Sequence, residues 1–452
     1  MDRRSFLAAA IGAAATTPAL AALDSDPQPM LRGTLNAAEL GIAAEDRDSQ
    51  SRSIQRLLDS ASDEDRQVFL PPGTYFVAEL NLPPRTRLAG VPGATRLVFG
   101  GGAHMIMGEH AEIVELTGIV IDGAGAPLEE YVPGILHLAE CRSVSIDNCV
   151  VVGSSRSGIA LDRCDGRVTR TTVRGAADAG IRAIESRGLS IAENTIEDCG
   201  NGGILVHRWT EGEDGTIVTG NRVSRIAARD GGTGQNGNGI NVFRAHGVIV
   251  ANNRVRDCAF TAIRANSANN VQITANNCSG SGEVGIYSEF AFEGAMIANN
   301  IVDGAATGIS VVNFNEGGRI AVISGNIVRN LTGSGPYTPS PPGFGTGIAI
   351  EADAAVTGNV IDGAPLFGMQ VGWGPYLRDV AATGNVIRRA PVGIAVSVAE
   401  GAGSAVISDN LISGADRGAI VGMLWAETAT GDLALTGARG YPHLLVERNR
   451  VS

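Results

Sequence analysis

Two short patterns of apolar and polar residues alternate along the chain from residue 148 to its end. In the first, an asparagine precedes a short strand-like run rich in β-branched residues, as at Asn194 and Asn300. In the second, a glycine and an isoleucine open an alternation of apolar and variable residues, as at Gly158 and Gly285. The glycine segments recur every 22 or 23 residues over much of the chain, and a period in the low twenties predicts a solenoid. The asparagine segments begin at Asn148, Asn194, Asn221, Asn253, Asn277, Asn300, Asn326, Asn359, Asn385, Asn410 and Asn449.

The residue chemistry of these segments indicates which solenoid is formed. Leucine-rich repeats would show a regular lattice of leucines, and helical repeats would show a 3.6-residue period over ten or more residues, but neither pattern is present. Short β-branched runs separated by Gly, Asn and Asp turns instead predict strands that pair with their equivalents in the next coil. We therefore expect an all-β fold, a right-handed single-stranded parallel β-helix of about eleven coils with three strands per coil. The 61 glycines and the aromatic content of only 4% agree with many short strands and turns.

The recurring asparagines and cysteines have predicted places in this fold. Asparagine side chains that turn inward at each coil would hydrogen-bond to one another along the axis, as in the ladders of stacked strands. The alternative is an exposed turn asparagine selected for left-handed backbone geometry. The six cysteines recur in matching places of the repeat without a CxxC pair, which favours buried free thiols over disulfides or metal ligands.

Residues 1–22 carry the features of an export signal. Arg3 and Arg4 precede Phe6 and Leu7, and an apolar, alanine-rich run follows, so the segment resembles a twin-arginine signal. The alternative is a general secretory signal or a membrane anchor that contains two arginines. The resemblance implies a periplasmic or secreted protein that meets the twin-arginine translocase during export. No later segment has 18 uncharged apolar residues, so no membrane span is expected in the mature protein. A net charge of −12 argues against a nucleic-acid partner.

Residues 23–100 differ from the repeat and are predicted to form an N-terminal cap with the first coils, followed by the repeat domain at 101–452. A short helix at 48–61 would place Ile54, Leu57 and Leu58 on one face and cover the open end of the first coil. This helix and the segment from Leu70 to Tyr75 resemble the entry of the pectate-lyase-like β-helix superfamily. Together with the export signal, the repeat is also similar to an uncharacterised family of twin-arginine-translocated repeat proteins. That resemblance implies a fold but no established activity.

Two insertions mark where a site is expected. The spacing from an asparagine segment to the next glycine segment is unusually long at 221–239 and 326–347, and both inserts are rich in turn residues. They would bracket four coil steps, a cleft of roughly 19 Å. Residues that alternate outward from the glycine strands would line it. We expect Arg264, Tyr287 and Glu289 as catalytic residues, because a guanidinium, a phenol and a carboxylate would lie on adjacent strands. The expected substrate-binding residues are Asn241, Asn266, Ser310 and Glu351, with the aromatic residues Trp209, Phe243 and Trp373.

The leading functional hypothesis is an exported protein that binds or modifies a polysaccharide. An arginine that grips a carboxylate favours an acidic glycan and lyase or epimerase chemistry over hydrolysis, and the paired carboxylates of a glycoside hydrolase are not evident. One alternative is a non-catalytic carbohydrate-binding or cell-envelope scaffold protein. Another is a cofactor-binding repeat protein, since twin-arginine export serves proteins that are loaded before translocation. The sequence names no cofactor, and no metal ligands are assigned.

Overall fold

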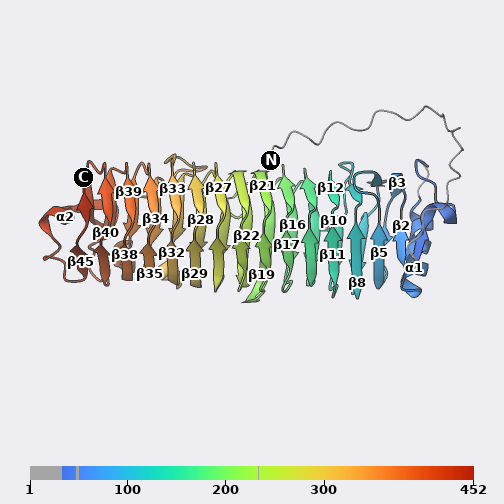
Figure 1. Cartoon of the computed structure of the whole chain (residues 1–452), viewed down its shortest axis with the longest axis horizontal. Coiled ribbons are helices and arrows are strands. Elements are labelled where there is room, and N and C mark those ends of the chain that lie inside the picture. Colours follow the sequence, from blue (N-terminus) through green and yellow to red (C-terminus); the bar gives the residue numbers. More distant parts are fainter. Residues whose placement is uncertain (1–32, 47–49, 233) are drawn as a thin grey trace, which may run out of the picture. The chain divides into compact units, whose positions relative to one another are not determined.

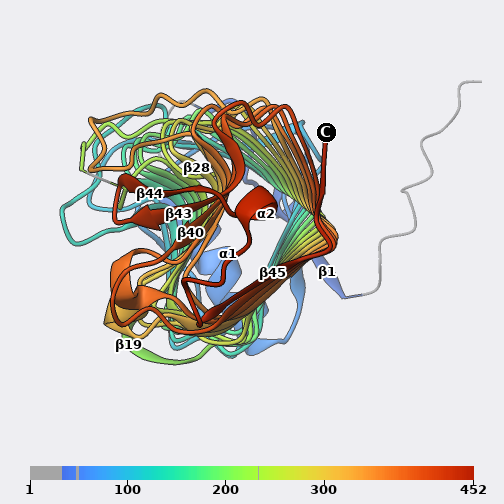
Figure 2. The same ribbon diagram turned by 90° about the vertical axis from the view of Figure 1, so that its left-hand side faces the viewer.

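The computed structural model describes residues 33–46, 50–232 and 234–452, and residues Leu35–Ser452 form one compact unit. This unit is a parallel β-helix in which the chain winds through three sheets, here called A, B and C, and each strand pairs with its equivalent in the next coil. Figure 1 shows the coils stacked along one axis, and in Figure 2 equivalent strands lie behind one another. The predicted fold class is confirmed. The predicted signal at residues 1–22 lies outside the described residues.

The bounds of the elements follow by sheet. Sheet A contains β1 (Thr34–Asn36), β2 (Gln67–Phe69), β5 (Arg85–Ala89), β8 (Ile113–Thr117), β11 (Val144–Asp147), β14 (Gly166–Thr169), β17 (Ser190–Ala192), β20 (Ile217–Thr219), β23 (Ile249–Ala251), β26 (Val271–Thr274), β29 (Glu293–Ala298), β32 (Arg319–Ser324), β35 (Ala352–Thr357), β38 (Arg378–Thr383), β41 (Ala405–Ser408) and β45 (Leu444–Glu447). Sheet B contains β3 (Gly73–Val77), β6 (Thr95–Phe99), β9 (Val120–Asp122), β12 (Val150–Val152), β15 (Thr172–Arg174), β18 (Thr195–Glu197), β21 (Arg222–Ile226), β24 (Arg254–Cys258), β27 (Asn277–Ser279), β30 (Ile301–Asp303), β33 (Ile327–Arg329), β36 (Val360–Asp362), β39 (Val386–Arg388), β42 (Leu411–Ser413) and β46 (Arg450–Val451). Sheet C contains β4 (Leu80–Asn81), β7 (Ile106–Glu109), β10 (Gly134–Ala139), β13 (Ser157–Asp162), β16 (Ala179–Ile184), β19 (Gly202–Glu213), β22 (Asn238–His246), β25 (Ile263–Asn266), β28 (Val284–Glu289), β31 (Thr307–Val311), β34 (Thr346–Ile350), β37 (Phe367–Val371), β40 (Val392–Ser397), β43 (Gly418–Leu424) and β44 (Glu427–Asp432). The helices are α1 (Ser51–Asp63) and α2 (Leu433–Thr436), with 3-10 turns η1 (Ala37–Leu40), η2 (Phe314–Glu316) and η3 (Gly374–Tyr376).

The β-helix has more coils than the eleven or so that the sequence repeat predicts. Its three sheets contain 16, 15 and 15 strands. The additional coils lie mainly at residues 67–122, where strands β2 to β9 already pair in register. These coils lack the asparagine segment, and their one glycine–isoleucine pair, Gly118–Ile119, precedes a strand of sheet B rather than of sheet C, so the repeat does not reveal them. The chain's last pairing in sheet C is antiparallel, between β43 and β44.

A ladder of buried asparagines runs along the turn between sheets A and B. The side-chain amide of each asparagine donates to the side-chain carbonyl of the next asparagine at 2.9–3.0 Å. That carbonyl also accepts from the backbone N–H of the donating asparagine, as Asn221 Oδ1 does from Asn194. Its members are Asn194, Asn221, Asn253, Asn276, Asn300, Asn326, Asn359, Asn385, Asn410 and Asn449. The predicted ladder of inward-facing asparagines is therefore confirmed, and the alternative of exposed turn asparagines does not hold for these residues.

Two asparagines that open predicted segments are not ladder members. The inward place belongs to Cys149 rather than Asn148, and to Asn276 rather than Asn277. Asn148 has a positive φ of 50°, and the residue directly before the inward position adopts this left-handed conformation in coil after coil, as Ala275 does with φ 56°. All six cysteines are buried and free, which confirms that prediction.

The helix α1 closes the N-terminal end of the core, as predicted from residues 48–61. Its apolar stripe buries Ile54, Leu57 and Leu58 to 5% exposure or less against the first coil. Ser62 Oγ accepts from the backbone N–H of Arg85 at 3.1 Å, which ties the end of the helix to β5. The cap thus removes an open sheet end that would otherwise pair with another chain.

Candidate functional site

Both insertions pack against sheet C. They contact neighbouring coils and do not stand at the two ends of a long cleft. The first connects β21 to β22, and its Gly234 carbonyl accepts from the guanidinium of Arg264. The second connects β33 to β34 and reaches back toward the N-terminus, where the Tyr337 hydroxyl donates to Glu283 at 2.7 Å. The ring of Tyr337 stacks on Phe260 with centroids 6.3 Å apart.

The predicted pairs on adjacent strands are present. Arg264 is in register with Tyr287, and Asn266 with Glu289. The Arg264 Nε donates to Glu289 Oε1 at 2.6 Å, and Asn266 Nδ2 donates to the same oxygen at 2.9 Å. Burial raises the pKa of Glu289, while Arg264 and Asn266 oppose this change. The carboxylate is 3% exposed, so these two neighbours rather than solvent satisfy it.

Tyr287 lies beside this pair without a direct bond to it. The guanidinium carbon of Arg264 lies 5.6 Å from the centre of the Tyr287 ring, within cation–π range. Burial raises the pKa of the phenol, and the Glu289 and Glu283 carboxylates raise it further. Tyr287 is therefore protonated at neutral pH. Ser310 is in register with Tyr287 on the next strand and is buried.

A cavity of about 500 Å³ opens on sheet C beside Arg264. One wall is aromatic: Trp209 and Phe243 meet edge to face at 6.5 Å, and the imidazole of His207 lies 5.7 Å from Phe243. Trp209 is 58% exposed, so its ring is free to contact a ligand. The lining residues are Asp178, Asn201, Leu205, His207, Trp209, Gly234, Gln235, Asn236, Asn241, Phe243, Arg264, Asn266 and Phe290.

The same cavity carries two buried polar atoms without hydrogen-bond partners among the described residues. Asn241 is only 6% exposed, and its Oδ1 is buried without a hydrogen bond among the described residues. The Nε2 of His207 is likewise buried and unpartnered within the described part of the chain. Burial, together with the nearby charge of Arg182, lowers the pKa of His207 to about 4, so the ring is neutral at pH 7. A ligand hydroxyl would satisfy the Asn241 oxygen.

The cavity continues toward the N-terminus into a second one of about 590 Å³, which shares Asp178 and Asn201 with it. The second cavity also carries Tyr131, Arg156 and Arg182. Together the two cavities form a groove, here called the sheet C groove, that follows the helix axis from β10 to β28. Six coil steps at about 4.8 Å give it a length of roughly 29 Å.

Three of the predicted substrate-binding residues lie outside this groove. Ser310 is not among its lining residues, and Glu351 accepts from the backbone N–H of Phe314 at 2.7 Å, holding the turn η2. Burial raises the pKa of Glu351 to about 7. Trp373 packs edge to face on Trp425 at 5.5 Å in a separate aromatic group nearer the C-terminus.

Sequence reasoning missed several groove residues. His207 and Leu205 alternate outward on β19, but they precede the first insert and lie outside the bracket of 239–347. The groove lies further toward the N-terminus than expected, because the first insert overhangs the coils before it as well as Arg264. Asp178 and Asn201 stand in turns before their strands, where no repeated pattern identifies them.

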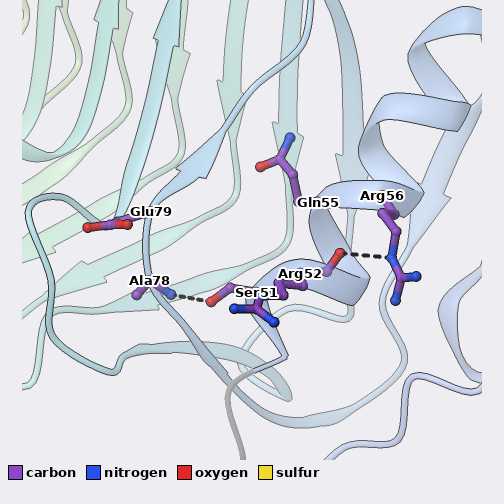
Figure 3. A pocket seen from close by; sticks show the side chains of 6 residues that line it. All are labelled: Ser51, Arg52, Gln55, Arg56, Ala78 and Glu79. Carbon is purple, nitrogen blue, oxygen red and sulfur yellow. Dashed lines mark hydrogen bonds between the residues drawn. The ribbon is translucent and has the colours of Figure 1, made fainter.

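A cavity of about 890 Å³ lies elsewhere, between α1 and the first coil (Figure 3). Its polar side chains attach the helix to the coil. Ser51 Oγ accepts from the backbone N–H of Ala78 at 2.8 Å, and Gln55 both donates to and accepts from the backbone of Asn81. The residues of this cavity attach the capping helix to the first coil, so we do not regard it as a candidate site.

Neither a metal site nor a membrane helix is found in the described ranges. No group of three or more His, Cys, Asp or Glu side chains is arranged to hold a metal ion in residues 33–46, 50–232 and 234–452. No helix in these ranges is long and apolar enough to cross a membrane.

Comparison with known proteins gives a family match and several solved structures. The family model described as a right-handed beta helix region matches residues 133–231 and 209–387. No curated protein matches the sequence. Among solved structures, the N-terminal fragment of bacteriophage Phi29 gene product 12 has 14% identity and a TM-score of 0.49, covering 86% of this chain and 68% of its own.

Two enzymes are also similar in structure. The catalytic unit of the GH87 α-1,3-glucanase from Streptomyces thermodiastaticus has 13% identity and a TM-score of 0.48, covering 98% of this chain and 70% of its own. The A-module of the Azotobacter vinelandii mannuronan C-5 epimerase AlgE6 has 14% identity and a TM-score of 0.43, covering 92% and 99%.

Proposed function

The chain belongs to the right-handed β-helix family, and from this fold and the sheet C groove we propose that it binds a polysaccharide laid along the helix axis. The observation that carries the proposal is the pairing of an exposed aromatic wall, Trp209 and Phe243, with the buried, unpartnered oxygen of Asn241. A sugar ring presents an apolar face to aromatic rings and hydroxyl donors to such an oxygen. The groove is open along the axis and long enough for several sugar units.

Binding is better supported than proton transfer by Glu289. Its Oε1 accepts from Arg264 and Asn266, and Glu289 does not line the cavity. Arg264 in turn is held by Glu289 and Gly234, so gripping a uronate would require it to exchange partners. The roles of Arg264, Tyr287 and Glu289 in catalysis stay a prediction.

A second candidate, modification of the glycan by a lyase or epimerase reaction, is favoured by His207. Its imidazole is neutral at pH 7, lines the groove and has an Nε2 without a partner in the described chain, so this nitrogen could accept a proton. Its pKa of about 4 makes it a weak base at neutral pH, so an approaching ligand would have to raise this pKa for efficient proton transfer. The adjoining cavity carries Arg156 and Arg182 together with the acidic residues Glu130, Asp178 and Asp230, so its charges do not select between an acidic and a neutral glycan. From the signal-like residues 1–22 we propose that the protein acts in the periplasm or outside the cell.

The test is a titration of the purified protein with a panel of neutral and uronate-containing oligosaccharides, followed by calorimetry. Trp209→Ala is expected to weaken binding by about tenfold, which corresponds to about 1.4 kcal/mol. Trp425→Ala is the matched control, because this tryptophan is also exposed (44%) but lies in the other aromatic group. A panel without any ligand, or equal losses in the two variants, would contradict the proposal.

A companion experiment separates binding from modification. Any glycan that binds is incubated with the protein and with His207→Gln, and the product is analysed for unsaturated ends and for epimerised units. Turnover by the wild type that is lost in His207→Gln while binding persists would support the second candidate. Binding without turnover would leave the protein as a carbohydrate-binding module.

A further inference from the structure

Two carboxylates of the sheet C groove, those of Asp178 and Asp230, are held together by one uncharged side chain. Asp178 lies in the turn before β16, and Asp230 lies in the first insert, before β22. Asn201 lies on the coil between them, and its Nδ2 donates to Asp178 Oδ1 at 3.2 Å and to Asp230 Oδ2 at 2.7 Å. The two accepting oxygens are therefore no more than about 6 Å apart. These two residues are here called the carboxylate pair.

Uncharged donors fix the geometry of the carboxylate pair. Asn201 is only 5% exposed, and its Oδ1 accepts from the backbone N–H of Asp230 at 3.0 Å, which sets the orientation of the amide. The hydroxyl of Ser157 donates to Asp178 Oδ2 at 2.8 Å. Within the described part of the chain, no Lys, Arg or His side chain forms an ion pair with either carboxylate.

Elsewhere on the β-helix, an arginine lies between carboxylates that are near each other. Arginines join Glu197 with Asp198, Asp65 with Glu115 and Glu185 with Asp214, and these arginines are Arg225, Arg87 and Arg208, respectively. Two like charges a few ångströms apart repel one another, and the guanidinium offsets this repulsion. In the carboxylate pair an amide occupies the place of the arginine, so no bonded side chain supplies the cation that would offset the repulsion.

The two arginines that line the adjoining cavity do not take this role. Arg182 Nη1 donates to Asp162 Oδ1 at 3.3 Å, so its charge already has a partner. Arg156 lies in the turn before β13, two coil steps from Asn201, which corresponds to roughly 10 Å along the axis. The space beside Asn201 therefore has more negative than positive charge close to it.

A third acceptor in the same groove is also without a donor. Asn241 is 6% exposed, and no described residue donates to its buried Oδ1. Asn241, Asn201 and Asp178 line the same cavity. A ligand group that satisfies this wall has to supply several hydrogen-bond donors together with a positive charge. An ammonium group carries three donors, and at about 2.9 Å from each of two carboxylate oxygens it spans a pair about 6 Å apart.

We propose that the sheet C groove binds a glycan containing an amino sugar with a free amine, whose ammonium group lies between Asp178 and Asp230. This inference rests on the proposed function, in which the aromatic wall of Trp209 and Phe243 receives other sugar units of the same glycan. A metal ion is a poorer occupant, because calcium takes about six to eight oxygen ligands, and no group of three or more His, Cys, Asp or Glu in the described ranges is arranged to hold a metal. The net charge of −12 also favours the approach of a cationic ligand.

Calorimetric titration of the purified protein at about pH 6, where the amine is protonated, tests this inference first. The ligands are β-1,4-linked oligomers of equal length made of glucosamine, N-acetylglucosamine or glucose, so that only the group at carbon 2 differs. The glucosamine oligomer is expected to bind at least about tenfold more tightly than the other two. If no amine-bearing glycan binds more tightly than its N-acetylated form, the inference is overturned, and the proposed function stands as long as neutral glycans still bind. Absence of binding to any glycan would contradict both.

Two variants test the assigned residues. Asp178→Asn and Asp230→Asn should each weaken binding of the glucosamine oligomer by at least about tenfold and change binding of the N-acetylated oligomer by less than about twofold. Circular dichroism verifies that each variant is folded. Asp416→Asn is the matched control, because Asp416 is exposed and lies in the corresponding turn before β43, nine coil steps or roughly 43 Å from Asp178. Unchanged affinity in the two variants, or an equal loss in the control, would overturn the assigned site.

Two further ligands identify the chemical class that carries the positive charge. Trilysine presents ammonium groups without sugar rings, and it should bind at least about tenfold more weakly than the glucosamine oligomer because it cannot stack on the aromatic wall. Calcium chloride should neither bind to the protein nor displace the glucosamine oligomer. Equal affinity for trilysine, or calcium binding that is lost in Asp178→Asn, would overturn the amino sugar as the occupant.

Discussion

Replacement of Asn276 by alanine is expected to be among the most destabilising single changes in the repeat. The side chain takes part in four hydrogen bonds. It donates to Val250 O at 2.9 Å and to Asn300 Oδ1 at 3.0 Å, and its Oδ1 accepts from the backbone N–H and the side-chain amide of Asn253. Alanine leaves both Asn253 donors buried without an acceptor. At about 1–3 kcal/mol for each unsatisfied group, the expected loss is about 2–6 kcal/mol.

The neighbouring Asn277 provides the control for this prediction. Asn277 is the same residue type in the next position of the same coil, but it is exposed, and alanine there should change stability by no more than about 0.5 kcal/mol. The free energy of unfolding of the three proteins is measured by urea denaturation, with the slopes compared to verify that the same unit unfolds. Equal losses for the two variants would refute the ladder as a source of stability.

Three further predictions concern the cap, the buried ion pair and the turn held by Glu351. Ile54→Ala, in the cap helix, should cost about 2–5 kcal/mol, measured by denaturation, and an unchanged midpoint would contradict the role of the cap in the core. Arg264→Met leaves Glu289 buried without its cation and should lower stability by about 3–5 kcal/mol, whereas Arg264→Met with Glu289→Met should recover most of it in thermal melts. The pKa of Glu351 is raised to about 7 in the folded protein, so the folded state retains its proton at a pH where the unfolded chain has lost it. Stability should therefore fall by up to about 3 kcal/mol between pH 4.5 and 7 relative to Glu351→Gln, and parallel pH profiles would show the reasoning to be wrong.

The fold follows closely from the sequence because each coil must bury one set of side chains and expose the other. Alternation in the glycine strands correctly assigns Ile286 and Ser288 to the interior and Tyr287 to the outer face. Alternation alone does not fix the ladder position where two candidates are adjacent. Asn276 and Asn277 have the same chemistry, and only the left-handed conformation of Ala275 before them decides which one turns inward.

The candidate site could be predicted only in part. Strand register brings Arg264 to Tyr287 and Asn266 to Glu289, and register is readable from the repeat. Whether Arg264 is available to a ligand depends on side-chain torsions and on the path of the first insert, which places the Gly234 carbonyl on its guanidinium. The same path of the first insert encloses the space above His207, which makes this residue part of the groove lining. Turn-rich inserts have no periodicity, so their direction is not visible in the sequence.

The asparagine ladder also sets the unit in which this protein changes length. Every rung offers the same donors and acceptors, so Asn326 makes the same bonds with Asn359 that Asn359 makes with Asn385. Removal of residues 359–384 would bring Asn385 directly under Asn326 and restore an uninterrupted ladder. Removal of half of those residues would place a turn beside a strand of the neighbouring coil. The buried asparagine amides of the ladder would then lack hydrogen-bond partners. Evolution of such a chain is thus expected to proceed by gain and loss of whole coils. Each added coil would lengthen the β-helix, and the surface along it, by the same amount.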